Sequence, residues 1–548
     1  MVRIIFFFAI IMFVLAWLLP IHSMPWVTFE SEILVAIAAL FICFSITIIN
    51  KKISIPKNTT LFIFLICIPL TQYVTGQVLY LSTSLLGVGY LLIFFLMVIS
   101  GYNLIHYRGY IFLKISYIFI FLGGISSLIS IFQWLNLDSW LTPFVLELRG
   151  GRPYANLAQP NSLASLFILS LLGAIYIYEK NELNLKFLVF LVFLISLGLI
   201  LAQSRTAWLS LGIISIYLGY KNKEVFSRFS LKINFMYLFF LALGIVLVPY
   251  VNDGLSVLFG NNIVDVTTIV ERVSSGYLRL DMWSQALLAI FESPWFGYGW
   301  NQTGLAQMTV FNTYPTIEWY RSAHNIVLDL ILWLGLPIGM FVIFYFGVGL
   351  KWLSKNSVTL ETIIGFSMII AILIHAMLEF PLHYSFFLFP TGFIIGLIYP
   401  KVCSGSFHVE RIVILVPIIT LFGLMYFLVK DYYLYKEKLQ IMSSNQSAYS
   451  EVDRTILSKD LIVLTEFRTN LWWKSLNPES KFSDLEIDEI QIYVWNHASQ
   501  YNLYKYAQIL AFNDKKEEAL NQLWIISKLH KKNYVYENLL LSRVDEVF

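Results

Sequence analysis

Three side chains in this chain have the chemistry of an anion site with a nearby base: Arg205, Arg279 and His324. Arginine is preferred over lysine where a planar, permanently charged group must bind phosphate or carboxylate through two hydrogen bonds. A neutral imidazole, such as that of His324, can accept a proton from a hydroxyl. Arginine can also snorkel or cap a helix, and a histidine at a helix entrance can be purely structural. Whether these residues form a functional site or have structural roles depends on the elements that hold them.

Those elements are predicted to be apolar helices. The chain is 58% hydrophobic and 13% charged, whereas a soluble domain carries roughly 25% charged residues. Apolar windows of about 17 to 25 residues, long enough to cross a bilayer, recur to beyond residue 400. We predict an all-α polytopic membrane protein of about 13 transmembrane helices. The expected spans lie near residues 4–19, 32–49, 61–80, 83–100, 111–132, 161–178, 187–203, 206–220, 233–250, 325–349, 360–379, 383–399 and 411–429.

The basic residues predict the orientation, because Lys and Arg in short loops stay on the cytoplasmic side. With the N-terminus inside, most basic residues fall in inner loops, and lysine is absent from the outer loops of the membrane part. An odd number of spans then places the C-terminal part outside. The outer loops hold only Arg149, Arg152, Arg205, Arg272, Arg279 and Arg321.

The composition changes abruptly near residue 430. We predict a transmembrane catalytic domain over residues 1–429, including a large outer loop at 251–323. Residues 430–548 are charged and polar with intermittent aromatics, and segments such as Tyr506 to His530 have helical spacing. We expect a soluble domain of paired helices there, with a weak hint of a tetratricopeptide-like unit.

The surroundings of the two arginines favour a site at the membrane surface. Arg205 lies in a short polar break, Gln203 to Thr206, between two spans, so its guanidinium is expected at the level of lipid phosphates. Arg279 begins a predicted amphipathic helix, Arg279 to Glu292, of the kind that lies along a membrane interface. The apolar face of this helix is expected to carry Leu280, Trp283, Leu287 and Ile290.

His324 ends the outer loop and opens the following span. Asp329 is expected to lie off the face of His324 and to fix the turn beside Asn325, because five residues do not make whole turns of a helix with 3.6 residues per turn. Other polar turns could line a site or simply satisfy helix ends. These turns are Arg152 to Asn161, which includes Gln159, then Glu379 to Tyr384, and Pro294 to Trp300. The aromatic side chains of the last turn could stack on sugars or lie at the membrane interface.

The order of these motifs resembles the O-antigen ligase/polymerase superfamily over nearly the whole chain. The motifs are Gln159-Pro160-Asn161, Ser204-Arg205-Thr206, Arg279 with Trp283, Pro294 to Trp300, Ala323-His324-Asn325 and Glu379 to Tyr384. The segment from Leu19 to Trp26, the Glu379 turn and the C-terminal region resemble the PglL-type branch, the bacterial protein O-oligosaccharyltransferases. In the ligase branch, His-Asn is followed after nine residues by Gly; His324, Asn325 and Gly335 match, whereas Ile338 departs from the usual small or hydroxylated residue.

The resemblance implies a GT-C-like fold and a transferase active at the periplasmic face of the bacterial inner membrane. Such an enzyme moves an oligosaccharide from undecaprenyl pyrophosphate to a Ser or Thr hydroxyl of a protein, often a pilin. Arg205 and Arg279 would bind the pyrophosphate, and His324 would activate or position the hydroxyl. No cofactor or metal is expected, because two arginines can supply the charge that Mg²⁺ supplies elsewhere. The residues expected to bind the glycan or acceptor are Gln159, Asn161, Asn325, Glu379 and Tyr384.

Three other functions remain open at this point. An O-antigen ligase would use the same donor with a lipid A-core acceptor, and an O-antigen polymerase would use another glycan. A transporter of lipid-linked glycans would show ionisable residues deep inside several spans and internal repeats. Here the charges collect at one membrane face and no inverted repeat is apparent, and the net charge of +3 gives no reason to expect nucleic acid as a partner.

Overall fold

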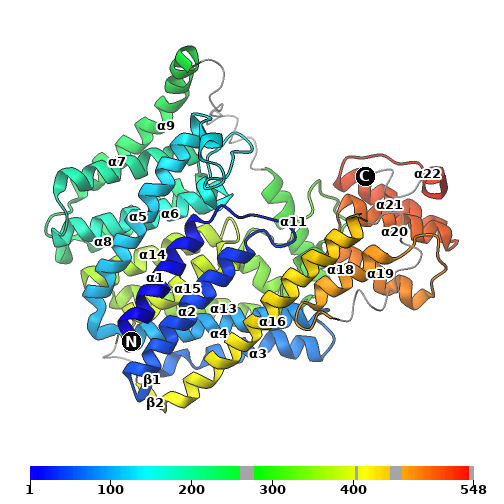
Figure 1. The fold of residues 1–548 in the computed structure, drawn as a ribbon, viewed down its shortest axis with the longest axis horizontal. Coiled ribbons are helices and arrows are strands. Elements are labelled where there is room, and N and C mark those ends of the chain that lie inside the picture. The colour runs from blue at the N-terminus through cyan, green and yellow to red at the C-terminus, as the bar shows by residue number, and fades with distance from the viewer. Residues whose placement is uncertain (260–276, 401–404, 445–459, 542–548) are drawn as a thin grey trace. The chain divides into compact units, whose positions relative to one another are not determined.

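The computed structural model describes residues 1–259, 277–400, 405–444 and 460–541 and is predominantly helical (Figure 1). The chain divides into two compact units. The first comprises Met1–Ile63, Tyr90–Ser275 and Gly347–Phe422, and the second comprises Phe64–Gly89, Gly276–Phe346 and Gly423–Phe548.

The first unit contains most of the long apolar helices. Its helices are α1 (Val2–Leu18), α2 (Phe29–Ile49), α5 (Arg108–Trp134), α6 (Pro160–Lys180), α7 (Leu185–Ala202), α8 (Arg205–Val225), α9 (Leu231–Phe259), α14 (Leu360–Ala376) and α15 (Ser385–Ile398). Its strands are β1 (Lys52–Pro56) and β2 (Ser406–Glu410), which pair antiparallel.

The second unit contains α11 (Tyr277–Glu292), α12 (Thr303–Thr309), α18 (Thr465–Ser475), α19 (Asp484–Asn496), α20 (Gln500–Phe512), α21 (Lys516–Leu529) and α22 (Tyr536–Leu541). The last five of these helices run from orange to red in Figure 1. Four further helices have residues in both units: α3 (Leu61–Val74), α4 (Leu81–Asn103), α13 (Ile326–Asn356) and α16 (Arg411–Ser444).

Each predicted span coincides with a helix, which confirms an all-α, multi-pass membrane protein. Eight helices of the described chain are long and apolar enough to cross a membrane, and three more are apolar but shorter. Helix α3 ends at Val74, before the predicted end of its span at residue 80, and continues into a turn. The total of about thirteen spans stays a prediction.

The core of the first unit is built around α6, whose side chains are buried on nearly all sides. A helix that is apolar all round needs neighbours on every face, and α5, α7 and α14 pack against it. At the N-terminal end of the chain, Trp17 of α1 is 1% exposed and meets Phe119, Phe386 and Phe387 edge to face. Helix α1 is therefore an integral part of this core.

The loop contacts of the first unit fall into two sets that match the predicted sides. Loops predicted to lie inside contact one another through the β1–β2 pair, Lys180 with Glu361 at 3.0 Å, and Lys221 with the Ser354 carbonyl at 3.1 Å. Loops predicted to lie outside contact one another through His22 with the Asn156 carbonyl, Arg152 with the Ala202 carbonyl, and Asn161 with Glu379. The short β1–β2 sheet was not predicted from the sequence.

The described parts of the predicted outer loop at residues 251–323 contain three helical segments. Helix α9 continues through Val251 to Phe259, and α11 and α12 occupy much of the second half, while Arg272 lies outside the described residues. Helix α16 likewise runs without a break across residue 430, so the predicted domain boundary falls inside a helix.

The C-terminal helices form a helical core of their own within the second unit. The predicted segment Tyr506 to His530 is a pair of helices, α20 and α21, that pack together around a break at Asn513–Lys515. Tyr80, Met308 and Phe311 join the buried cluster formed by α18–α22. Asp431 of α16 accepts hydrogen bonds from the backbone amides of Val463 and Leu464, at 2.6 and 3.0 Å, and so fixes the start of the C-terminal helices.

Candidate active site

His324 lies in a turn whose backbone is held in a left-handed conformation, with φ of 51°. Outside glycine this region is sparsely populated, and a residue stays there when its surroundings hold it. Asp329, 1% exposed, accepts hydrogen bonds from the Ala323 amide at 2.8 Å, Thr303 Oγ1 at 2.9 Å and Ser322 Oγ at 2.5 Å. Ser322 Oγ in turn accepts the His324 amide at 3.1 Å. As predicted, Asp329 fixes this turn.

Asn325 caps the helix that follows. Its side-chain carbonyl accepts hydrogen bonds from the amides of Val327 and Leu328, at 3.0 and 3.3 Å, at the start of α13. This is the usual N-cap arrangement, which satisfies amides that have no partner inside the helix. Asn325 therefore sets the direction in which α13 leaves the His324 turn.

Helix α11, which carries Arg279, is tied to the same turn. Trp283 Nε1 donates a hydrogen bond to the Ala323 carbonyl at 3.0 Å. Arg279 lies one helical turn before Trp283 and is partly exposed. The predicted helix from Arg279 to Glu292 is thus confirmed as α11, and the Trp283 hydrogen bond connects it to the backbone beside His324.

The residues of the predicted apolar face of α11 differ in exposure. Ile290 is buried, but Leu280 and Leu287 are 56% and 47% exposed. The side of α11 that packs inward instead includes Met282 and the fully buried Gln285, which is bonded to the Tyr314 carbonyl at 2.6 Å. Hydropathy alone does not identify this inward side, because a hydrogen-bonded glutamine can be buried. The exposed leucines leave an apolar surface on the opposite side.

Helix α13 is interrupted at Gly335, where φ is 74° and ψ is 169°. The aromatic and glycine turn from Pro294 to Trp300 hydrogen-bonds to the backbone at this interruption. The Leu336 amide donates to the Pro294 carbonyl at 2.7 Å instead of continuing the helix, and Pro337 has no amide hydrogen. The carbonyls left by the break are those of Leu332 and Trp333, and they accept amides of the turn: Tyr298 at 2.7 Å and Gly299 at 3.2 Å. This satisfies backbone groups that lipid could not.

In the first unit, Arg205 is the first residue of α8, and Ser204 is its N-cap. Ser204 Oγ accepts the Ala207 amide at 3.3 Å and donates to Asn161 Oδ1 at 2.9 Å. A cation in the first turn opposes the helix dipole, whereas an anion bound there is attracted both by the cation and by the amides of the helix start. The position of Arg205 therefore suits an anionic ligand better than it suits the helix.

Arg152 holds the junction between α7 and α8 through hydrogen bonds to backbone carbonyls. Its Nε and Nη2 donate to the Ala202 carbonyl at 3.0 and 2.8 Å, and Nη2 also reaches the carbonyl of Gln203 at 3.2 Å and Asn161 Oδ1 at 3.3 Å. The carbonyls at the end of α7 are thereby satisfied. Sequence reasoning gave Arg152 no role of its own; its place in an outer loop without lysine was the available signal.

Asn161 and Glu379, both predicted to bind substrate, are bonded to each other. Asn161 Nδ2 donates to Glu379 Oε1 at 2.9 Å, and Glu379 is 6% exposed. Gln159 precedes α6, and its Oε1 accepts the Ser162 hydroxyl at 2.5 Å. Asn161 therefore joins the α6, α8 and Glu379 segments.

Tyr384 stacks on Phe386, with ring centroids 5.1 Å apart and planes at 14°. Beside it, the Ser385 amide donates to Glu32 Oε2 at 2.8 Å, and the Tyr90 hydroxyl donates to the same oxygen at 2.7 Å. Glu32, on α2, is 4% exposed. This buried carboxylate anchors the Tyr384 turn, and it was missed from the sequence although an acid inside an apolar window is a signal for a specific role.

The predicted site residues thus fall into two groups. Gln159, Asn161, Arg205, Glu379 and Tyr384 belong to the first unit, and Arg279, His324 and Asn325 belong to the second. Within the first group, hydrogen bonds link Asn161 with the Arg205 helix start and with Glu379. Within the second, hydrogen bonds link the Arg279 helix with the His324 turn.

These features define a class of protein: a polytopic helical membrane protein with arginines near helix starts and a histidine in a fixed turn. Residues 190–344 match the O-Antigen ligase family, and residues 363–535 match the family described as Virulence factor membrane-bound polymerase, C-terminal.

Two relatives cover large parts of the chain. It is 36% identical to a general O-oligosaccharyltransferase of Acinetobacter baylyi over 541 residues, which are 97% of this chain and 94% of the relative. It is 33% identical to a ComP-specific O-oligosaccharyltransferase of the same organism over 372 residues, 67% of this chain and 66% of that relative. The chain belongs to the PglL-type O-oligosaccharyltransferases of the O-antigen ligase/polymerase superfamily, which confirms the resemblance of its motifs.

Proposed function

We propose that this enzyme transfers an oligosaccharide en bloc from undecaprenyl pyrophosphate to a Ser or Thr hydroxyl of a periplasmic or pilin protein. The observation that carries the proposal is the His324 turn, whose left-handed backbone is fixed by the buried Asp329. A fixed turn of this kind suits a residue whose side chain must meet a reacting group in one geometry. The relatives named as O-oligosaccharyltransferases support the reaction class.

In the proposed reaction, the imidazole of His324 accepts the proton of the acceptor hydroxyl as the oxygen attacks the anomeric carbon. A new carbon–oxygen bond forms to the protein, the bond between the anomeric carbon and the phosphate oxygen breaks, and undecaprenyl pyrophosphate leaves with the electron pair. Arg205 and Arg279 bind the pyrophosphate and stabilise the charge that develops on it. The two guanidinium groups supply this charge without a metal ion.

The other predicted residues have supporting roles in this proposal. Gln159 and Tyr384 orient the glycan or the acceptor, whereas Asn161, Glu379 and Asn325 hold the segments that carry Arg205 and His324. The active site faces the periplasm, across the bacterial inner membrane from the lysine-rich loops. The exposed Leu280, Phe291 and Trp295 support an interfacial placement of the Arg279 helix, because apolar side chains at 56%, 73% and 70% exposure favour lipid over water.

The test is coexpression of the chain with a lipid-linked glycan pathway and a candidate pilin, followed by intact mass measurement of the pilin. The expected result is a mass increase of one complete glycan, lost when His324 is replaced by Ala. An unmodified pilin together with O-antigen on lipopolysaccharide would establish an O-antigen ligase in place of the proposed enzyme. Longer glycans with neither acceptor modified would establish a polymerase.

A further inference from the structure

The second unit contains a cavity of about 550 Å³ that none of the residues of the proposed reaction lines. This volume lies within the range of small-molecule sites, roughly 300–1,000 Å³. The residues come from the turn before α4 and from α18 and α19: Leu79, Tyr80, Arg468, Thr469, Trp472, Glu489, Ile492 and Tyr493.

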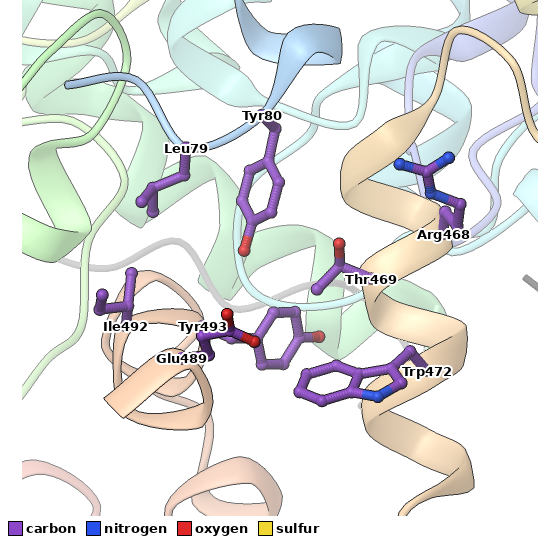
Figure 2. Close-up of a pocket in the computed structure, with 8 residues that line it drawn as sticks. All are labelled: Leu79, Tyr80, Arg468, Thr469, Trp472, Glu489, Ile492 and Tyr493. Carbon is purple, nitrogen blue, oxygen red and sulfur yellow. The ribbon is translucent and has the colours of Figure 1, made fainter. Parts of the chain in front are cut away.

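Three of the lining residues carry aromatic rings (Figure 2). The Tyr80 ring descends from its loop with its hydroxyl toward Tyr493, while Thr469 and Trp472 lie on α18. Tyr80 and Tyr493 are 9% and 1% exposed, and Trp472 is half-buried. Flat rings with hydroxyl groups at their edges offer apolar faces and hydrogen-bonding atoms in the same space.

The margin of the cavity carries one charge of each sign, Arg468 and Glu489, and both residues are exposed. Neither the guanidinium nor the carboxylate forms a hydrogen bond or ion pair with another residue that the structure describes. The pair adds no net charge, so the cavity does not select for a polyanion or a strongly charged peptide. It offers hydrogen-bond donors and acceptors together, as a ligand rich in hydroxyl groups requires.

The walls of the cavity are held rigidly by a polar cluster beside them. Glu466 Oε1 accepts His497 Nε2 at 2.9 Å, and the Glu466 amide donates to Ser82 Oγ at 3.1 Å. The His497 ring stacks on Tyr493, with centroids 4.7 Å apart, and approaches Tyr80 at 6.5 Å. The two tyrosines are therefore fixed in place before any ligand arrives, which lowers the entropic cost of binding.

We propose that this cavity is a subsite for neutral sugar residues of the glycan, those remote from the sugar that reacts. Sugars present C–H faces to aromatic rings and hydroxyl edges to donors and acceptors, and the cavity supplies both. A peptide is a poorer fit, because helices and a turn form the lining and offer no strand edge for main-chain pairing. The assignment rests on the proposed function, since it concerns a part of the proposed donor.

Direct binding tests the subsite independently of transfer. Full-length protein in detergent is mixed with chitotetraose or maltotetraose, and saturation-transfer NMR measures which sugar protons lie against the protein. We expect a signal from at least one sugar with the wild type, and a loss of roughly 3- to 10-fold in affinity for Trp472→Ala, since an aromatic contact contributes about 0.5–1.5 kcal/mol. The matched control, Trp495→Ala, removes a part-buried tryptophan of α19 that is not in the lining and should bind as the wild type does.

Transfer assays then separate this subsite from the proposed reaction. Undecaprenyl pyrophosphate carrying chitotetraose is compared with the same lipid carrying one N-acetylglucosamine. We expect Trp472→Ala to raise KM for the longer donor and to leave the shorter donor and kcat unchanged. Equal effects on both donors, no sugar signal with the wild type, or a raised KM for the acceptor protein instead would overturn the subsite. Sugar binding without transfer of either donor would refute only the proposed reaction.

Discussion

The two groups of site residues are held by different means. The start of α8, with Arg205, is held by hydrogen bonds among the side chains of Arg152, Asn161 and Ser204; Arg205 itself is helical, and the left-handed residue there is the preceding Gln203, with φ of 46°. In the His324 turn, the buried carboxylate of Asp329 binds the backbone amide of Ala323, next to the left-handed backbone of His324. Under the proposed roles, a side-chain network holds the group that binds the pyrophosphate, whereas a buried carboxylate fixes the main chain of the group that accepts the proton.

The largest effect should come from His324. Asparagine also tolerates a left-handed backbone, so His324→Asn removes the imidazole with little added strain. We expect kcat for glycan transfer to fall about 10²- to 10⁴-fold, while the thermal unfolding temperature stays close to that of the wild type. His324→Ala serves as the comparison and should unfold at a lower temperature. Near-normal transfer by His324→Asn would remove His324 from the role of base.

Asp329→Ala should give the next largest effect. It leaves the Ala323 amide and the Ser322 and Thr303 hydroxyls without their acceptor, at a cost of about 1–3 kcal/mol for each buried group left unsatisfied. Transfer should fall by about 10²-fold, because a misplaced catalytic group costs a factor of that order. Asp329→Asn retains a carbonyl acceptor and should recover part of both losses, as measured by kcat and by thermal unfolding. Full activity in Asp329→Ala would show that the turn does not need its carboxylate.

Substitutions of Arg205 and Arg152 should have smaller effects than those at His324 and Asp329. We expect Arg205→Lys to raise KM for the lipid-linked donor by about 10-fold, because lysine keeps the charge but cannot form a two-point contact with phosphate. Arg152→Gln should instead lower the unfolding temperature, since it removes the donors that satisfy the Ala202 and Gln203 carbonyls. Unchanged donor KM in Arg205→Lys would exclude two-point binding of the pyrophosphate.

A smaller, pH-dependent effect is expected at Glu466. Burial alone raises the pKa of this carboxyl group, but the hydrogen bond and electrostatic attraction of His497, with the charge of Arg321, outweigh burial and hold the pKa below its ordinary value of 4.5. A carboxylate with a lowered folded pKa stabilises the protein at neutral pH, and that stability is lost as the pH falls from about 4.5 through the folded pKa. The difference in unfolding temperature between wild type and Glu466→Gln should therefore shrink between pH 7 and pH 3. A constant difference would contradict this.

The smallest effect concerns metal ions. Because two arginines provide the proposed positive charge, EDTA should leave the transfer rate unchanged once the protein has been dialysed. Recovery of a lost rate by added Mg²⁺ or Mn²⁺ would show that the arginines do not act alone.

Sequence patterns predicted the helices well and their contacts poorly. Each apolar window coincides with a helix, and the period of α11 identified a helix, because both signals are local. The inward side of α11 could not be read the same way, since Gln285 is buried through bonds to a distant loop and Leu280 is left outside. The β1–β2 pair joins segments about 350 residues apart, which no local pattern encodes.

The same limit applies to the site. The residue types with reactive chemistry, Arg205, Arg279 and His324, stand out in an apolar chain. Arg152 holds the segment before Arg205 and Glu32 holds the Tyr384 turn, through carbonyls and amides far away in sequence whose identity no local pattern gives. The sequence does place Asp329 correctly, because its role follows from helical spacing alone.

The break in α13 has a consequence for how this protein can change over evolution. Side chains at Gly335 and Gly297 would each collide with the backbone of the opposite segment: a Cβ on Gly335 meets the Trp295 carbonyl, and one on Gly297 meets the Leu332 carbonyl. Once either glycine is lost, the junction has already opened, so losing the second should add little further damage. The two positions are therefore expected to vary together among descendants of this chain, as one inherited unit rather than as two independent sites.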